Sequence, residues 1–114
     1  MTLAEEYDKK ARDITYPERP KKPARENFSS HADYGAALDI WEREREQYKE
    51  RERAYREEQG RVMAEFRAAV AAELGLTGHP KFDALYDIAW SHGHSSGFSE
   101  VYYWCDELAP LIRD

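Results

Sequence analysis

Residues 31–74 read HADYGAALDIWEREREQYKERERAYREEQGRVMAEFRAAVAAEL, and this stretch determines the fold class. It contains no proline, which would remove a backbone donor from a helix interior. Ser30 precedes the stretch and Asp33 follows three residues later, an arrangement typical of a helix start. Gly75 comes directly after it, where many helices end with a residue of positive φ. We therefore predict one long α-helix over about residues 31–74.

Aromatic side chains recur along this predicted helix at intervals of seven residues. They are Tyr34, Trp41, Tyr48 and Tyr55, and Val62 continues the spacing. The companion heptad position is apolar only at its ends, at Leu38 and Phe66, and is polar between them. A coiled coil carries apolar residues at both positions. This half-apolar seam is therefore suited to packing against one neighbouring segment.

The two halves of the predicted helix differ in polarity. Residues 41–58, WEREREQYKERERAYREE, carry opposite charges three and four positions apart, and each such pair stabilises a helix by about 0.2–0.5 kcal/mol. We interpret this run as a solvated face. Beyond Gly60 apolar residues become frequent, and we expect the following to enter the main core: Val62, Met63, Phe66, Ala69, Val70 and Leu74.

The N-terminal 25 residues predict a short helix followed by a stiff linker. Thr2 and Glu5 form a capping-box pattern, and apolar residues then recur at helical spacing. Pro17, Pro20 and Pro23 each fix the backbone and favour an extended, polyproline-like conformation. We predict residues 1–25 as this helix and a proline-rich linker that acts as a spacer.

The C-terminal part predicts a helical hairpin. GLTGHP at residues 75–80 is a turn, and apolar residues at helical spacing follow on both sides of a second turn near residues 91–97. We predict two short helices over about residues 81–113 that fold back onto the C-terminal half of the long helix. Pro110 is expected to terminate or kink the last turn. The predicted fold class is all-α, with a helical domain over residues 26–114.

Charge and composition exclude several classes of protein. The net charge is −6, and residues 1–25 carry +2 while the last 42 residues carry −5, which fits neither a uniformly acidic DNA mimic nor a basic nucleic-acid-binding face. No apolar run approaches the roughly 18 residues of a membrane span. The single cysteine, Cys105, agrees with a reducing compartment. We expect a cytoplasmic protein with no membrane association.

Glycine, serine and histidine cluster between residues 91 and 97, SHGHSSG, and three interpretations remain open. In the first, Gly93 and Gly97 permit a tight reversal, Ser95 or Ser96 caps the last helix, and the histidines bond to nearby backbone. In the second, amides at the helix start bind a phosphate or carboxylate together with nearby side chains. The side chains that would take part are His92, His94, Ser95 and Ser96.

The third interpretation is a metal site at the same turn. His92 and His94 would be joined by a carboxylate or by a further histidine. The candidates for that third ligand are Asp87, Glu100 and His79. None of them has a diagnostic spacing, so we predict no metal and no cofactor.

The sequence contains no recognisable catalytic machinery. Ser95 lies near two histidines, but no nucleophile elbow surrounds it, and a small helical hairpin offers no evident oxyanion hole. Glycine-rich loops that hold nucleotide phosphates are absent as well. We expect a protein that is not an enzyme.

A surplus of aromatic side chains favours binding to a protein. Tyr102, Tyr103 and Trp104 are consecutive on a helix and point in three directions, so they cannot all face one core. Tyrosine and tryptophan are enriched at interface hot spots. The predicted partner-binding residues are Trp41, Tyr48, Tyr55, Tyr102 and Tyr103. Two alternatives are that these rings face one another within the monomer, or that the stripe forms a homodimer.

A further alternative uses the basic residues of the proline-rich stretch. Nucleic-acid phosphates would be contacted by Arg19, Lys21, Lys22 and Arg25. Because the chain as a whole is acidic, we rank this interpretation below protein binding.

The C-terminal third carries a resemblance. His79-Pro80, AWSHGHSSG at residues 89–97, Glu100-Val101 and Asp106-Glu107-Leu108 are similar to small uncharacterised proteins of tailed bacteriophages with an AW-x-x-GHSSG-like hairpin. The resemblance implies a phage-encoded accessory protein and supplies no catalytic residues. The expected role is to bind and occlude a host or phage protein, such as a host-defence or nucleic-acid-processing complex, in the host cytoplasm.

Overall fold

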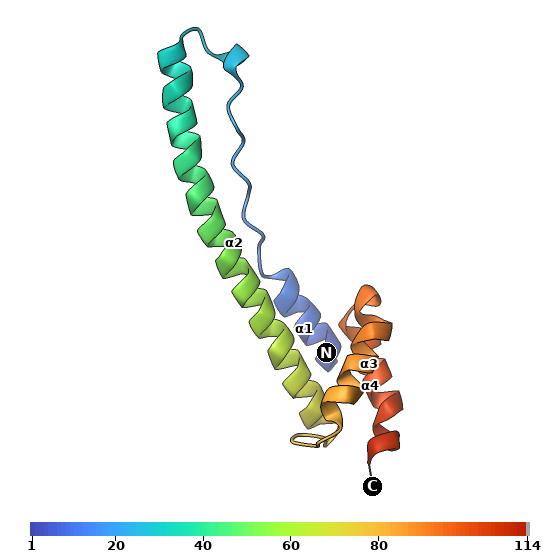
Figure 1. Ribbon diagram of the computed structural model, residues 1–114. Coiled ribbons are helices and arrows are strands. Elements are labelled where there is room, and N and C mark those ends of the chain that lie inside the picture. Colours follow the sequence, from blue (N-terminus) through green and yellow to red (C-terminus); the bar gives the residue numbers. More distant parts are fainter. Residues whose placement is uncertain (114) are drawn as a thin grey trace. The chain divides into compact units, whose positions relative to one another are not determined.

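The computed structural model describes residues 1–113, and these residues form helices and turns without a β-strand (Figure 1). The α-helices are α1 (Leu3–Arg12), α2 (His31–Glu73), α3 (Phe82–Gly93) and α4 (Phe98–Ile112). Two short 3₁₀ turns, Arg25–Asn27 and His94–Ser96, connect them. The prediction of an all-α fold with one long helix and a C-terminal helical hairpin is confirmed. Within residues 1–113 no helix combines the length and the apolar character that crossing a membrane requires.

The chain divides into two compact units. The terminal unit contains residues 1–14 together with the chain from residue 59 onward, and the middle unit is Thr15–Glu58. Residues of α2 therefore belong to both units. The predicted boundary near residue 25 does not coincide with this division, because α1 packs with the C-terminal helices instead of standing apart from them.

Local hydrogen bonds start the helices where the sequence predicts. The Glu5 amide donates to Thr2 Oγ1 at 3.2 Å, and the Asp33 amide donates to Ser30 Oγ at 3.1 Å. Each bond satisfies one of the first four N–H groups of a helix, which have no partner within the helix. Both predicted helix starts are confirmed.

The end of α2 is a Schellman motif. Gly75 has a φ of 69°, the Leu76 amide donates to the Ala71 carbonyl at 2.7 Å, and the Gly75 amide donates to the Ala72 carbonyl at 3.1 Å. Leu76 then enters the core with an exposure of only 2%. The positive φ explains why glycine occupies this position, and the buried leucine directs the chain back towards α3.

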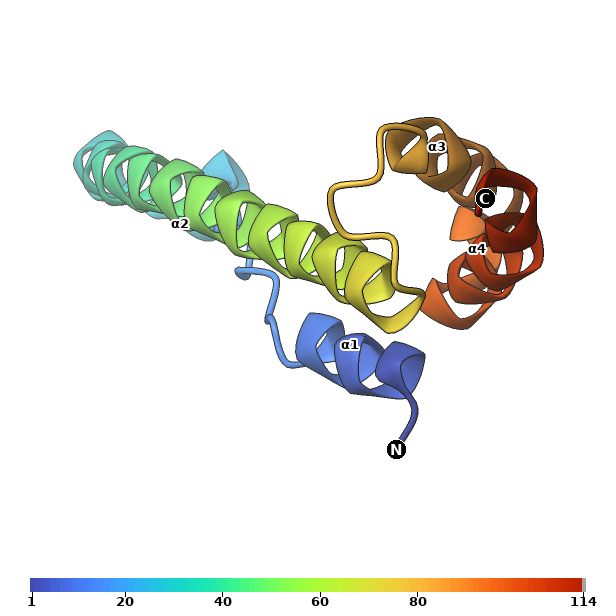
Figure 2. The same cartoon turned by 90° about the horizontal axis from the view of Figure 1, so that it is seen from below.

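The core of the terminal unit is built by all four helices. Tyr7 of α1 meets the Phe66 ring edge-on with centroids 5.6 Å apart, and Phe66 meets Phe98 of α4 at 4.4 Å. Figure 2 shows α1 beside the C-terminal part of α2, in agreement with Figure 1. The other buried members are Val62, Val70, Ala71, Leu74, Leu76, Phe82, Leu85, Tyr86, Ala89, Val101, Cys105 and Ala109. The C-terminal half of the long helix is thus covered by the hairpin, as predicted.

Two glycines shape the reversal between α3 and α4. A Cβ atom at Gly93 would lie 2.7 Å from the Val101 amide nitrogen, so only glycine allows this close approach of the two helices. Gly97 adopts a φ of 103° and occupies the N-cap position of α4, where no side chain caps the helix. The expectation that Ser95 or Ser96 caps α4 is therefore wrong, because both serines belong to the preceding 3₁₀ turn and Gly97 takes the N-cap position.

Pro110 lies inside α4 and does not end it, because the helix continues to Ile112. The following residue, Arg113, donates from its guanidinium to the Leu74 carbonyl at 2.5 Å. This bond joins the end of α4 to the end of α2 and closes the terminal unit.

In the middle unit an extended segment runs along α2. Figure 1 shows this stretch, residues 15–28, here called the proline segment, lying antiparallel to the N-terminal part of the helix; it is extended up to the 3₁₀ turn Arg25–Asn27. Its three prolines are half-buried, and no backbone hydrogen bond joins it to α2 within the described residues. The predicted extended conformation is confirmed, but the segment packs against the helix instead of serving as a free spacer.

Candidate protein-binding surface

Three of the predicted partner-binding residues are covered by the chain itself. Tyr48 is only 7% exposed, and Trp41 and Tyr55 are half-buried. Tyr16 of the proline segment contacts both tyrosines, with ring centroids 6.3 Å from Tyr48 and 4.9 Å from Tyr55. The expectation that this aromatic stripe is open to a partner is wrong, because the proline segment of the same chain packs on it.

A hydrogen-bonded cluster fixes the start of the proline segment on α2. The Tyr16 hydroxyl donates to Glu52 Oε2 at 2.5 Å and lies 2.7 Å from the Tyr48 hydroxyl, which also donates to Glu52 at 3.0 Å. The bond from Tyr16 and then the bond from Tyr48 hold the pKa of the Glu52 carboxyl below its usual range. The bond to Glu52 raises the pKa of Tyr16. Glu52 therefore occupies a polar position of the heptad seam where its carboxylate accepts the hydrogen bonds of both hydroxyls.

Basic residues of the predicted nucleic-acid strip lie over the aromatic stripe. Arg19 lies 5.8 Å from the Tyr48 ring centroid, and Lys22 lies 5.5 Å from that of Trp41. Arg25 lies 5.9 Å from the ring of Tyr34, and its guanidinium also donates to a backbone carbonyl. Such cation–π contacts contribute about 0.5–1 kcal/mol at exposed sites. Three of the four basic residues therefore hold the segment on α2.

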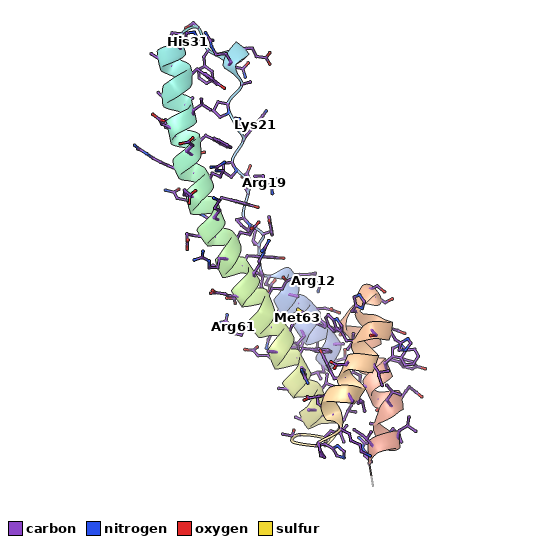
Figure 3. The ribbon with its side chains drawn as sticks, viewed as in Figure 1. Arg12, Arg19, Lys21, His31, Arg61 and Met63 are labelled. Carbon is purple, nitrogen blue, oxygen red and sulfur yellow. The ribbon has the colours of Figure 1, made fainter. Side chains whose placement is uncertain are left out.

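The fourth basic residue, Lys21, contacts no ring. It borders a shallow polar cleft together with Glu44 and Arg51 of α2. Figure 3 shows Arg19 and Lys21 on the extended segment alongside the helix. Since basic and acidic side chains alternate there, no uniformly positive strip is formed, and nucleic-acid binding stays a prediction from the sequence alone.

The contacts of the proline segment repeat because two periods match. An extended polyproline chain advances about 9.3 Å in three residues, and seven helical residues advance about 10.5 Å. Every third residue of the segment therefore meets every seventh residue of α2, in antiparallel order. The contacting residues of the segment are Tyr16, Arg19, Lys22 and Arg25, and those of the helix are Tyr55, Tyr48, Trp41 and Tyr34.

The histidines of the SHGHSSG turn serve structural contacts. His94 stacks on the Trp90 ring with centroids 5.7 Å apart, and its Nδ1 lies 2.8 Å from the Trp90 carbonyl oxygen. His92 stacks on Trp104 with centroids 4.6 Å apart. The reversal at Gly93 and Gly97 and the backbone bond of His94 follow the first interpretation of this turn, whereas His92 stacks on a ring instead. Within residues 1–113 no group of three or more histidine, cysteine or acidic side chains is placed to hold a metal ion.

A small pocket of about 280 Å³ adjoins the same turn. Val62, Met63 and Phe98 form part of its apolar wall, while His94 and Asp8 contribute polar atoms. Neither Ser95 nor Ser96 lines it. The anion site predicted at the start of α4 is not tested by this arrangement and stays a prediction.

The two remaining predicted residues differ in accessibility. Tyr102 is half-buried against the core, and burial raises the pKa of its hydroxyl. Tyr103 is 53% exposed and meets the Trp104 ring edge-on at 6.2 Å. Of the five aromatic residues predicted to bind a partner, Tyr103 is therefore the one that the fold leaves open.

Tyr103 belongs to a larger apolar surface that the sequence reasoning missed. Ile88 is 49% exposed and Leu111 is 75% exposed. Trp104, Leu108 and Leu111 lie at i, i+4 and i+7 on α4, so they share one side of that helix. The stacking of His92 on Trp104 places the Ile88 side of α3 next to this row, because Ile88 and His92 are four residues apart. The hairpin face consists of the exposed Ile88, Tyr103 and Leu111 together with Trp104 and Leu108, which are half-buried against the core.

A family model covers nearly the whole chain. The model describes a family of unknown function, DUF8546, and it matches residues 3–113. The chain belongs to this family. No curated protein and no solved structure matches it. Because the match extends over α1 to α4, both the terminal and the middle unit are part of what defines DUF8546.

Acidic side chains border the hairpin face. Glu107 follows Trp104 by three residues and precedes Leu111 by four, so it lies on the same side of α4. Asp87 directly precedes Ile88 on the exposed part of α3. Within the described residues neither carboxylate forms an ion pair, whereas Asp83 is paired with Arg67. The hairpin face is thus an apolar surface with a negative border.

Proposed function

We propose that this member of DUF8546 is a non-enzymatic accessory protein that binds another protein through the hairpin face. The observation that carries the proposal is the group of large apolar side chains left exposed on α3 and α4, namely Ile88, Tyr103 and Leu111. The other exposed large apolar residues among those described, Met1, Tyr16 and Ile40, lie elsewhere in the sequence and on other elements.

Exposing an apolar surface of this kind to water costs free energy, which is recovered when a partner covers it. Monomeric proteins rarely expose large contiguous apolar patches, and those they expose are often functional. Tryptophan and tyrosine are also the side chains that most often dominate binding energy at an interface. Trp104 already packs on His92, so its orientation is set before a partner arrives and little rotamer entropy is lost on binding.

The absence of enzymatic activity is part of the proposal. Cys105 is buried, and burial raises the pKa of its thiol to about 11, which disfavours the nucleophilic thiolate. His92 and His94 stack on tryptophan rings, and the His94 Nδ1 is taken up by a backbone carbonyl. These contacts support structural roles for the residues that catalysis would most readily use.

The biological setting is proposed from the resemblance of the C-terminal third. The AWSHGHSSG stretch of residues 89–97 resembles small accessory proteins of tailed bacteriophages. The same stretch builds the turn that orients α3 against α4 and thereby forms the hairpin face. We place this protein in the host cytoplasm, where it would occlude a host or phage protein such as a defence or nucleic-acid-processing complex.

The test is affinity capture from bacterial lysate, with and without nuclease, read by mass spectrometry. The baits are the native chain, a double variant Tyr103→Ser with Leu111→Ser, and the control Ile40→Ser, which removes an exposed apolar side chain from α2. We expect a nuclease-resistant partner on the native and control baits and its loss from the double variant. Circular dichroism of the three baits verifies that their helix content is equal.

Two results would contradict the proposal. A partner that the double variant captures as well as the native chain does would remove the hairpin face from consideration. Recovery of the native chain alone, together with a doubled mass in light scattering, would favour a homodimer instead.

A further inference from the structure

The charge around the hairpin face restricts the chemistry of its partner. Residues 82–113 contain five carboxylates, at Asp83, Asp87, Glu100, Asp106 and Glu107, against a single lysine or arginine, Arg113. Arg113 is directed to the Leu74 carbonyl, and Asp83 is neutralised by Arg67. The charges left next to the apolar side chains are therefore negative.

The shape of the surface restricts the partner further. Tight packing at Gly93 holds α3 and α4 close together. The apolar side chains of the hairpin face follow α4 at helical spacing, and Ile88 of α3 borders them. A pair of packed helices presents a shallow groove into which the side chains of a third helix fit. An amphipathic helix that enters such a groove uses apolar anchors at i, i+3 or i+4, and i+7.

We propose that the hairpin face binds a basic amphipathic helix of the partner protein, an inference that rests on the proposed function. Apolar anchors of that helix cover Trp104, Leu108 and Leu111. Lysine or arginine side chains flanking the anchors face Glu107 on one side and Asp87 on the other. Nucleic acids and anionic membrane surfaces are repelled by the same carboxylates.

The probes for this inference are two synthetic peptides of 18 residues, about the length of a five-turn helix. Both carry the same leucine stripe, and their polar positions are all lysine in one peptide and all glutamate in the other. Binding of each peptide, labelled with a fluorophore, is followed by fluorescence polarisation against the full chain. We expect the lysine peptide to bind and the glutamate peptide to bind at least tenfold more weakly.

Charge reversal gives the sharper comparison. In the double variant Asp87→Lys with Glu107→Lys, the lysine peptide should lose about tenfold in affinity and the glutamate peptide should gain. The matched control is Asp39→Lys with Glu42→Lys, which changes the net charge equally on an exposed part of α2. The control separates a local effect from attraction to the whole acidic chain, so it should leave the preference for the lysine peptide in place.

The outcomes distinguish this inference from the function on which it rests. Equal binding of both peptides by the native chain, or equal effects of the two charge reversals, would overturn the basic-helix inference. A captured partner that is lost with Tyr103→Ser and Leu111→Ser but retained with Asp87→Lys and Glu107→Lys would overturn it as well, while leaving protein binding intact. Failure of the serine variant to lose a partner would count against the proposed function itself.

Discussion

At Gly93 a single hydrogen atom decides how closely α3 and α4 approach. An added Cβ would lie 2.7 Å from the Val101 amide nitrogen and 2.8 Å from the Glu100 carbonyl carbon. Both are backbone atoms of α4, so they cannot move aside as a flexible side chain can. The close contact between α3 and α4, which orients the hairpin face, therefore depends on the glycine at position 93.

Replacing Gly93 with alanine should destabilise the protein by about 1–3 kcal/mol, the usual cost of overpacking a tight contact. Urea unfolding followed by circular dichroism measures this change. The matched control is Gly60→Ala, where no atom lies within 4 Å of the added Cβ. Within a helix that replacement should stabilise by about 1 kcal/mol. Equal effects of the two alanines would show that α3 and α4 do not meet at Gly93.

Two buried groups make the terminal unit sensitive to alkali. Burial raises the pKa of Cys105 from 9.0 to about 11 and that of Tyr86 from 10.0 to about 12. Because the unfolded chain loses these protons at lower pH than the folded chain does, both groups contribute stability below about pH 9. The contribution is lost as the pH rises through the interval between the unfolded and folded pKa values.

The free energy of unfolding should therefore fall as the pH rises from about 9 to about 12, which urea titrations at several pH values measure. In Cys105→Ala the decline should begin near pH 10, because only tyrosine hydroxyls with raised pKa values, Tyr86 foremost, then contribute. A decline that begins at pH 9 in both proteins would contradict the assignment to Cys105.

At the scale of an element, the proline segment and α2 stabilise each other through repeated side-chain contacts. Arg19, Lys22 and Arg25 all make the same kind of cation–π contact. If the segment slid along α2 by three of its own residues, each cation would meet the next aromatic ring, so these contacts do not set the register. The bonds of Tyr16 to Tyr48 and Glu52 tolerate no such shift. Tyr16 therefore determines the register.

Tyr16→Phe should raise the pKa of Glu52 towards its ordinary value of 4.5, since the bond from Tyr16 is the main reason that it is low. A ¹³C-detected NMR titration of the glutamate carboxyls measures this. In the native chain the cluster contributes stability above about pH 4.5, which is lost as the pH falls through the lower folded pKa of Glu52. Tyr7→Phe is the control, because that hydroxyl makes no bond to Glu52. An unchanged Glu52 titration in Tyr16→Phe would show that the segment is held elsewhere.

At the scale of the whole molecule, the two units have separate contacts. The hydrogen-bond and ring partners of Tyr16, which are Tyr48, Glu52 and Tyr55, lie in the middle unit, and Cys105 is buried in the core of the terminal unit. Removing the Tyr16 ring should therefore affect one unit and spare the other.

In Tyr16→Ala the fluorescence of Trp41 should become more accessible to iodide, while Cys105 stays as slow to react with a maleimide as in the native chain. Replacing Trp90 and Trp104 by phenylalanine in both proteins isolates the Trp41 signal. Faster labelling of Cys105 in Tyr16→Ala would show that the two units unfold together.

The sequence by itself determined the helices, their starts at Thr2 and Ser30, and the end of α2 at Gly75. These signals depend on hydrogen bonds that span no more than five residues, so they are present in the chain before it folds. The heptad spacing of the aromatic stripe also predicted that one neighbouring segment would cover it. It could not identify that segment as residues 15–28, because the match between three extended residues and seven helical ones exists only after the chain has turned back on itself.

Only the tertiary structure decided which aromatic side chains remain accessible. Tyr48 and Tyr103 look alike in the sequence, yet the proline segment covers the first, and nothing among the described residues covers the second to the same extent. The sequence does not distinguish Ile88 and Leu111 from core residues, because an apolar residue at helical spacing is equally compatible with a buried position. Their exposure follows from the side on which α3 and α4 meet, and the close contact at Gly93 sets that side. The hydrogen bonds at helix ends depend on residues close together in the sequence, whereas the burial of a side chain depends on which distant part of the chain packs against it.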